Sequence, residues 1–253
     1  MHITVFGAAG WLGRACLANL AGRHDVRAVD LDDAAWEKFR DIDGPTVGEE
    51  VVHVDIRDYE GVDRAIADTN AVLHLTAAFP SQEPAQAEMG FGVNVRGLWN
   101  VLESCHRRDI RRIVHVGSCQ VAHPNGEFFE SDVRRPDGSL YAVTKRLQEE
   151  MCRQFHEAFG TSIVVLRPAS IEDSRLGIRY NHARLGEEDG ALNPGSVCRH
   201  DLAEACRLAL ESKTIDFDIL HIVGMPEADE TCNAARAREV LKLTCRGNLE
   251  QYR

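Results

Sequence analysis

Short apolar runs alternate with longer segments of helical period along the first two thirds of the chain. The apolar runs are residues 3–6, 26–29, 51–54, 71–75, 113–116 and 163–166. The segments that carry apolar side chains at three- and four-residue spacing are 11–20, 59–67, 93–105 and 141–159. Gly160 stands where a left-handed C-cap would end the last of them. This alternation predicts the α/β class, with a Rossmann-type, doubly wound parallel sheet of six strands.

The alternation lapses after Arg167 and Pro168. A polar, glycine-containing stretch reaches about residue 197, and a helix over 201–210, a strand over 217–223 and a helix over 234–243 follow. We therefore expect a Rossmann domain over residues 1–167. Residues 168–253 are expected to form a small substrate-side cap, packed on the same domain, with elements returning to the sheet.

Composition limits the partners and the compartment. The formal net charge of −11, from 29 basic and 40 acidic side chains, predicts an acidic surface that repels phosphate backbones and anionic membranes. We expect neither nucleic acid nor a membrane as partner. The eight cysteines form no C-x-x-C pair and the histidines no metal-ligand spacing, so reduced thiols and no metal are expected. The absence of a basic and apolar leader, and of any apolar run of membrane-spanning length, favours a cytoplasmic location.

Three glycines follow the first predicted strand and lead into the first predicted helix. In "GAAGWLG", Gly7, Gly10 and Gly13 would let the backbone turn tightly, approach a pyrophosphate and pack helix against strand. The helix N-terminus, opened by Trp11 and Leu12, would face the phosphate charge. We predict that these five residues bind the cofactor.

An acidic residue ends the second predicted strand. Asp30 lies seventeen residues beyond Gly13 (30 − 13), where a carboxylate can accept both ribose hydroxyls of an adenosine and repel a 2′-phosphate. This favours NAD over NADP, and Asp32 and Asp33 add to the repulsion, although the nearby Arg14 argues the other way. The alternative is that Asp30 or Asp32 caps the helix in "AAWEKF".

Asp55 and Ile56 end the third predicted strand. The pair could line the adenine pocket of a dinucleotide site. Alternatively, Asp55 caps the helix that starts near Tyr59. The sequence leaves both interpretations open.

A tyrosine and a lysine lie four residues apart on the last long helix. Tyr141 and Lys145 would share one face, roughly 5–6 Å apart at Cβ. A nearby ammonium lowers the pKa of a phenol, so such a pair could exchange a proton with an alcohol or carbonyl while Lys145 binds the nicotinamide ribose. Ser118 follows the fifth strand at the carboxyl edge of the sheet, where it could hold the substrate oxygen; a serine that merely terminates a strand is the alternative.

Taken together, these features resemble the extended short-chain dehydrogenase/reductase superfamily, an NAD-dependent epimerase/dehydratase family, and most closely its uronate dehydrogenase-like branch. The resemblance spans nearly the whole chain, through "GAAGWLG", "AVLHLTAA", "VNVRGLWNVLES", "RIVHVGS", Pro136 before "LYAVTK", "VVLRPASI" and "HDLAEACRLAL".

The resemblance implies roles for individual residues. Tyr141 would be the general acid/base, Lys145 the ribose ligand, and Ser118 the second hydroxyl at the reacting oxygen. Asn94 resembles the family asparagine that ties a helix to the active-site loop; a locally bonded amide inside the helix is the alternative. Further cofactor-binding residues would be Leu75, Ala77 and Pro168.

Departures from the family pattern bear on the reaction. Dehydratases carry an acid pair after the serine, where this chain has Cys119 and Gln120. Epimerases usually have an aromatic residue and a glycine a few positions on, where this chain has Ala122 and His123. Dehydration is therefore disfavoured, and the short segment after Leu166 favours a substrate smaller than a nucleotide-sugar.

The expected substrate is a sugar or sugar acid. By resemblance to the uronate dehydrogenases, Ser170 and an arginine such as Arg175 would bind its hydroxyls and carboxylate, beside Ser118, Cys119 and Gln120. For Arg175 and Arg179 the alternative is a solvated loop charge, and for His123 an ordinary loop residue.

Three functions compete at this point. The first is an NAD-dependent dehydrogenase that moves a hydride from the hydroxyl carbon of a sugar or sugar acid to nicotinamide. The second is an epimerase that acts on a nucleotide-sugar with tightly bound NAD, and the third a non-catalytic dinucleotide sensor. The family resemblance also implies a homodimer through the helices that start near Val93 and Tyr141.

Overall fold

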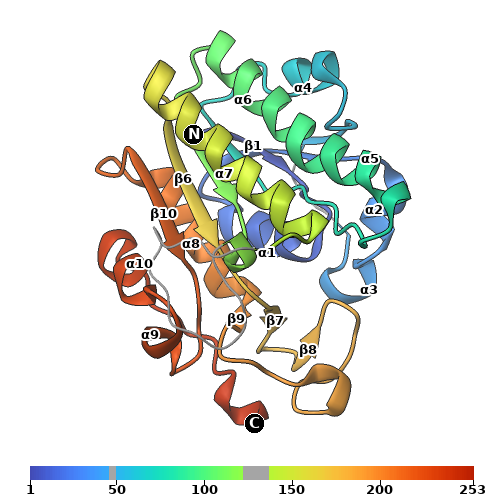
Figure 1. Cartoon of the computed structure of the whole chain (residues 1–253), viewed down its shortest axis with the longest axis vertical. Helices are drawn as coiled ribbons and strands as arrows, with labels where there is room; N and C mark the ends of the chain where they lie inside the picture. The colour runs from blue at the N-terminus through green and yellow to red at the C-terminus, as the bar shows by residue number, and fades with distance from the viewer. Residues whose placement is uncertain (46–49, 122–136) are drawn as a thin grey trace.

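The computed structural model describes residues 1–45, 50–121 and 137–253. Ala122, His123 and Pro136, which entered the sequence comparison, lie outside these residues. Seven parallel strands form the central sheet (Figure 1), in the order β10-β6-β5-β4-β1-β2-β3. Their bounds are β1 (His2–Phe6), β2 (Asp25–Asp30), β3 (Glu50–His53), β4 (Ala71–His74), β5 (Arg112–Val116), β6 (Ser162–Arg167) and β10 (Phe217–His221). The predicted doubly wound sheet is confirmed, and β10 adds a seventh strand to the six that the first two thirds of the chain supply.

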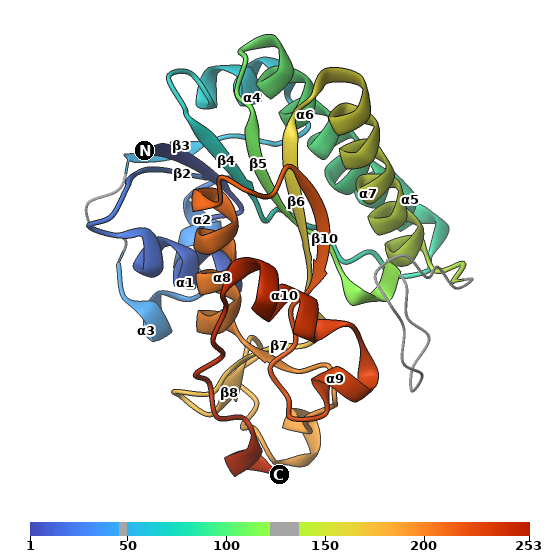
Figure 2. The same cartoon turned by 90° about the vertical axis from the view of Figure 1, so that its left-hand side faces the viewer.

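Helices cover both faces of the sheet, as Figure 2 shows: α1, α8 and α10 on one side, α4, α6 and α7 on the other. Their bounds are α1 (Trp11–Leu20), α4 (Tyr59–Ala65), α6 (Gly97–Arg107), α7 (Leu140–Phe159), α8 (Arg199–Glu211) and α10 (Ala234–Leu241). Shorter helices are α2 (Asp33–Glu37), α3 (Arg40–Asp43), α5 (Ala87–Met89), the π-helical η2 (Gly90–Arg96) and α9 (Ala228–Thr231). Gly160 ends α7 with φ +65°, which confirms its predicted left-handed C-cap.

Alternate residues of each strand fill two apolar cores. Val5, Leu73 and Val114 pack toward α1 and α8, whereas Val72 and Ile113 pack toward α4, α6 and α7. Because parallel strands are buried on both faces, nearly every strand residue is apolar. All eight cysteines are free thiols, and seven of them are buried. No helix among the described residues is long and apolar enough to cross a membrane.

Residues 168–253 do not fold apart from the sheet. α8 packs on α1, and β10 pairs with β6 along its whole length. What projects beyond the carboxyl edge of the sheet is a small lobe, which we call the substrate-side lobe. It consists of β7 (Ile171–Asp173), β8 (Ile178–Arg179), β9 (Val197–Cys198) and their connections. The elements expected to return to the sheet are therefore α8, β10 and α10.

Candidate active site

The strand order reverses between β1 and β4, which are neighbours in the sheet. In open α/β sheets, ligands bind at the carboxyl ends of the strands beside such a switch point. Gly7 follows β1 there with φ +81°, and a Cβ on it would lie 2.8 Å from the Thr76 nitrogen. Leu75, after β4, donates its N–H to the Phe6 carbonyl at 2.9 Å. The two strand ends therefore meet where only a glycine fits.

Gly13 allows α1 to pack on the loop that precedes it. A Cβ there would lie 2.2 Å from the Gly7 carbonyl oxygen and 2.5 Å from that of Ala8. Gly10, the N-cap of α1, offers no side-chain cap, so N–H groups of the first helical turn remain as donors. Trp11 and Leu12 open that turn, and their side chains are buried. This N-terminus has the geometry of an anion site.

Asp30 and Asp32 have different tasks. Asp32 Oδ1 accepts the Ala35 N–H at 3.0 Å and so caps α2, as one of the two alternatives for this residue proposed. The Asp30 carboxylate instead accepts the N–H of Ala9 at 2.9 Å and that of Leu31 at 2.8 Å. The helix-cap interpretation of Asp30 is therefore wrong, and its carboxylate lies beside the glycine loop.

Arg14 does not offer a free cation to a 2′-phosphate. Its side chain is buried, stacks over the Trp36 ring at 5.3 Å, and donates to the carbonyls of Trp36 and Gly44, the latter at 2.8 Å. The concern that Arg14 raised for NADP is therefore not supported by its contacts. The arginine fixes the segment after β2 to α1 instead.

Asp55 does not cap a helix either. Asp58 caps α4 by accepting the Glu60 N–H at 3.2 Å, which makes the cap interpretation of Asp55 wrong. Asp55 binds the Arg57 guanidinium, and this pairing lowers the pKa of the carboxyl. Ile56 is buried, and its carbonyl accepts a hydrogen bond from Asn100 at 2.9 Å.

Tyr141, Lys145 and Ser118 come together at the carboxyl edge of the sheet. The Ser118 hydroxyl lies close enough to the Tyr141 phenol to lower its pKa, and the Lys145 Nζ lies 5.8 Å from the centroid of the Tyr141 ring. Lys145 is fully buried and donates to the Val116 carbonyl at 3.3 Å. Ser139 caps α7 by accepting the Ala142 N–H, so the helix begins just before the tyrosine. The three side chains thus meet although 27 residues separate the serine from the lysine (145 − 118).

The pKa of the Tyr141 phenol differs from the expectation. Burial raises the pKa of Tyr141 to about 12, and the Ser118 hydroxyl offsets only part of the rise. Burial also lowers the pKa of Lys145 to about 8, against the opposing attraction of Glu149. The prediction that a nearby ammonium lowers the phenol pKa was wrong for the protein as described, because removal of the phenolate from water dominates.

Asn94 ties three segments together. It lies in the π-helical η2, and its side chain exchanges two hydrogen bonds with the main chain of Ala78, at 2.7 and 3.0 Å. Its amide also donates to Thr144 Oγ1 on α7 at 3.0 Å. The locally bonded amide proposed as an alternative is wrong, and the predicted tie to the loop after β4 is confirmed. Ala77 precedes this anchored residue in the same loop.

The residues after Ser118 pack against the end of β6. The Cys119 N–H donates to the Pro168 carbonyl at 2.8 Å, and its thiol donates to the Arg167 carbonyl at 3.1 Å. Burial raises the pKa of the Cys119 thiol well above its usual range. The Cys119 side chain is therefore directed into the protein interior. The Ser139 N–H, and to a smaller extent the Gln120 side chain, lower the pKa of Asp137, just before α7.

Ser170 and Arg175 lie in the substrate-side lobe. Ser170 Oγ accepts a hydrogen bond from Asn193 at 2.8 Å. The Arg175 N–H donates to Asp173, whereas its side chain is exposed and has no ion-pair partner among the described residues. Arg179 pairs with the buried Glu172 at 3.2 Å and is not a solvated charge. None of the contacts of Ser170 or Arg175 reaches Tyr141.

An aromatic residue that was not predicted from the sequence lies against Tyr141. The Phe79 ring stacks on the Tyr141 ring, with 5.2 Å between centroids and 19° between planes, yet its side chain is 77% exposed. Its loop is fixed by Asn94 on one side and by Gln82 on the other, which accepts the Leu140 N–H at 2.9 Å. A large aromatic residue that follows two alanines beyond a strand end was the available signal.

The sequence also gave no sign of a buried ion pair behind Lys145. Glu149 binds Arg167 through two hydrogen bonds of 2.6 Å, and both side chains are excluded from solvent. Because Glu149 lies one turn beyond Lys145 on α7, its carboxylate favours the charged form of the lysine. No cluster of three or more metal-ligating side chains occurs in the part of the chain that is described.

The Rossmann sheet has a glycine cradle at its switch point, and a serine, a tyrosine and a lysine lie at the same edge. This combination is typical of nucleotide-dependent enzymes of the short-chain dehydrogenase type. The comparison with family models agrees, because the model "NAD dependent epimerase/dehydratase family" matches residues 3–183. The chain belongs to this family, which confirms the predicted membership and, at the level of the family, NAD as cofactor.

Individual relatives indicate which branch of the family this chain resembles. The uronate dehydrogenase of Pseudomonas syringae is 29% identical over 175 residues, which cover 67% of this chain and 59% of that protein. The uronate dehydrogenase of Pseudomonas putida is 29% identical over 255 residues, covering 92% of this chain and 87% of the relative. A UDP-glucuronic acid 4-epimerase from Bacillus cereus, solved in complex with NAD, shares the fold with a TM-score of 0.79 and 20% identity, covering 99% of this chain and 95% of that one.

Proposed function

We propose that this protein is an NAD-dependent dehydrogenase of sugars or sugar acids. The observation that carries the proposal is the meeting of Tyr141, Ser118 and Lys145 at the sheet edge that also bears the glycine cradle. A phenol, a hydroxyl and an ammonium at that position serve proton exchange with a substrate oxygen. Sequence similarity to two uronate dehydrogenases supports a uronate as substrate.

The residues of the cradle fit NAD. Glycine at positions 7 and 13 lets the loop pack tightly against the end of β4 and against α1, so that its main chain is open to a pyrophosphate, and the N-terminus of α1 supplies N–H donors for the phosphate charge. Asp30 would accept the adenosine ribose hydroxyls, and the engagement of Arg14 with carbonyl groups favours NAD over NADP. The further residues proposed to hold the cofactor are Gly10, Trp11, Leu12, Asp55, Ile56, Leu75, Ala77, Asn94 and Pro168. When bound, NAD supplies a hydride acceptor.

The side chains of the chain itself handle the proton. The protonated Tyr141 phenol would donate to a carbonyl oxygen in the reductive direction, and the phenolate would take the hydroxyl proton in the oxidative direction. Ser118 would hold the same oxygen through its hydroxyl. Lys145, whose pKa is about 8, keeps its ammonium at neutral pH and would donate to the ribose hydroxyls.

The substrate would lie between the loop after β4 and the substrate-side lobe. The exposed, unpaired side chain of Arg175 is suited to a carboxylate, and Ser170, Gln120 and the Cys119 main chain offer polar contacts for hydroxyls. The exposed face of Phe79 is suited to the apolar face of a sugar ring beside the phenol.

A screen of uronic acids and neutral sugars, each with NAD and with NADP, tests the proposal. We expect reduced cofactor to accumulate with at least one uronic acid, and with NAD in preference to NADP. Failure of every sugar and sugar acid to reduce NAD, with the folded protein binding NAD, would contradict the proposed function.

An epimerase is the second candidate. Its support is the likeness in fold to the UDP-glucuronic acid 4-epimerase, which covers nearly the whole chain. An epimerase returns the hydride to the same sugar, so reduced cofactor would not accumulate. Conversion of a UDP-uronic acid into its epimer without net NADH would replace the dehydrogenase by this function.

We also propose a homodimer that associates through η2, α6 and α7. Large apolar side chains are exposed along these helices: Phe91, Trp99 and Leu147. Such side chains on a soluble chain indicate a surface that another subunit covers. Sedimentation is expected to give twice the mass of one chain, and a monomer at all concentrations would contradict this.

We propose a cytoplasmic location. Eight free thiols, seven of them buried, suit a reducing compartment. Fractionation of the source cells with a specific antibody tests this, and recovery only from an oxidising compartment would contradict it.

A further inference from the structure

A buried arginine joins the cofactor-binding half to the substrate-side lobe. Arg199 begins α8, and its side chain is 2% exposed. Its guanidinium stacks on the Trp11 ring at 4.0 Å and donates to the Trp11 carbonyl at 3.4 Å. Trp11 belongs to the glycine loop, and its indole N–H donates to the Ile171 carbonyl in the lobe at 3.1 Å. The contacts of Trp11 with Arg199 and Ile171 therefore hold the first turn of α1 against the lobe.

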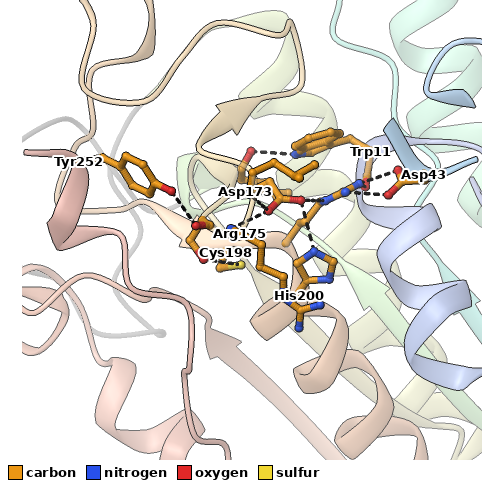
Figure 3. Close-up of polar contacts among 11 residues, drawn as sticks. Trp11, Asp43, Asp173, Arg175, Cys198, His200 and Tyr252 are labelled. Atoms are coloured by element: carbon orange, nitrogen blue, oxygen red, sulfur yellow. Dashed lines mark hydrogen bonds and ion pairs between the residues drawn. The ribbon is translucent and has the colours of Figure 1, made fainter. Parts of the chain in front are cut away.

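The same guanidinium binds two carboxylates from different parts of the chain. Two of its nitrogens donate to Asp43 at 2.7 and 2.8 Å, and its Nε donates to Asp173 at 2.6 Å. Asp43 lies in α3, on the segment that follows β2 and its Asp30. Trp11, Asp43 and Asp173 gather around one point in Figure 3. Arg199 therefore bridges the adenosine side of the cofactor site and the lobe.

Asp173 connects Arg199 to the turn that carries Arg175, the arginine proposed to bind the substrate. Its Oδ1 accepts the N–H groups of Arg175 and Leu176 at 2.8 and 3.0 Å, while its Oδ2 accepts from Arg199 and from His200, the latter at 3.2 Å. The Asp173 side chain is wholly buried, so all of its acceptor capacity is directed to these four partners. The turn that carries Arg175 is consequently fixed to Arg199 through a single carboxylate.

We propose that Arg199 is a positioning residue that couples NAD binding to sugar binding. It holds the adenosine-side segment through Asp43 and the Arg175 turn through Asp173, so order in one favours order in the other. The sugar arm of this inference rests on the proposed function, whereas the cofactor arm does not. Because Arg199 bonds to both carboxylates, a substitution of either one is expected to disturb the segment that the other holds.

Two amide variants test the coupling by crossed measurements. Asp173→Asn changes the lobe side, and its effect is measured on the dissociation constant of NAD by calorimetry. Asp43→Asn changes the adenosine side, and its effect is measured on the KM of the uronate. We expect each constant to rise about fivefold. Loss of a negative charge near a pyrophosphate would by itself tighten NAD binding, so weaker binding points to positioning.

Controls separate coupling from general damage. Glu37→Gln removes a carboxylate from the same segment, but within the described residues the Glu37 side chain bonds to Arg40 of that segment alone, so both constants are expected to stay unchanged. Asp43→Glu retains a carboxylate and is expected to restore most of the uronate affinity. A lower melting temperature in both amide variants with unchanged binding constants would overturn the proposal. If no sugar is oxidised, the NAD titration of Asp173→Asn still decides it.

Discussion

The glycine loop and the substrate-side lobe border the same site but are held in place by different means. In the loop, main-chain atoms touch so closely that a Cβ at Gly13 would lie 2.2 Å from a carbonyl oxygen. In the lobe, short strands of two or three residues depend on buried charges, chiefly Asp173 and Arg199. The loop is specified by residues next to one another in sequence, and the lobe by side chains far apart. Variants should therefore fail in different ways in the two regions.

The largest effect is expected from a change that spares both regions. Tyr141→Phe removes the phenolic oxygen but keeps the ring that stacks on Phe79. We expect kcat to fall about a thousandfold, because proton transfer is lost, with the dissociation constant of NAD unchanged. Stopped-flow and steady-state measurement of NADH would check this. Retention of wild-type turnover would remove the tyrosine from the mechanism.

In the loop, Gly13→Ala is expected to weaken NAD binding about a hundredfold, because the added methyl group forces main-chain atoms apart. Calorimetric titration measures the loss. Gly138→Ala is the matched control, since a Cβ on Gly138 meets no atom within 4 Å and its variant should bind NAD normally. Equal affinity of Gly13→Ala and wild type would show that the loop is not the pyrophosphate site.

Behind the site, the buried pair of Glu149 and Arg167 should contribute chiefly to the stability of the fold. Glu149→Gln leaves a guanidinium buried without its carboxylate, and we expect a loss of about 3–5 kcal/mol in the free energy of unfolding. Denaturant titration gives the value. Glu60→Gln, which removes an exposed partner of Arg64, should change stability little. Similar effects of the two variants would refute the importance of burial.

The smallest effect concerns pH. Lys145, with a pKa of about 8, carries an ammonium below that pH and a neutral amine above it. Since charged donors bind hydroxyls more strongly, NAD affinity should fall about threefold as the pH rises through 8. Lys145→Arg keeps its charge and should show no such step. Titrations of both proteins on either side of pH 8 compare them, and a step of the same size in Lys145→Arg would assign it to another group.

The features that could be predicted from the sequence also differ between the glycine loop and the substrate-side lobe. The helix starting at Trp11, the Gly160 C-cap and the three-glycine cradle depend on neighbouring residues, and all were predicted from local patterns. The partners of Arg199 were not, because 156 residues separate it from Asp43 and no local pattern links them. The raised pKa of Tyr141 was missed for a related reason, since burial is set by the whole fold and not by the spacing to Lys145.

The same holds for the residues of the lobe. Arg175 was selected by resemblance, but the carboxylate that fixes its turn comes from Asp173, whose own position depends on Arg199. Phe79 was missed because its place beside Tyr141 arises only when the loop after β4 is tied down by Asn94. Local sequence thus predicted the structure of the glycine loop in detail and that of the substrate-side lobe only in outline.

In the proposed reaction, a hydride passes from the sugar to NAD and is not returned to the sugar. The most direct test uses a uronate with deuterium on its oxidisable carbon and follows the label in sugar and cofactor. The account predicts that each molecule of sugar oxidised yields one molecule of deuterated NADH. A sugar that returns epimerised, with its deuterium retained and no reduced cofactor in solution, would contradict it.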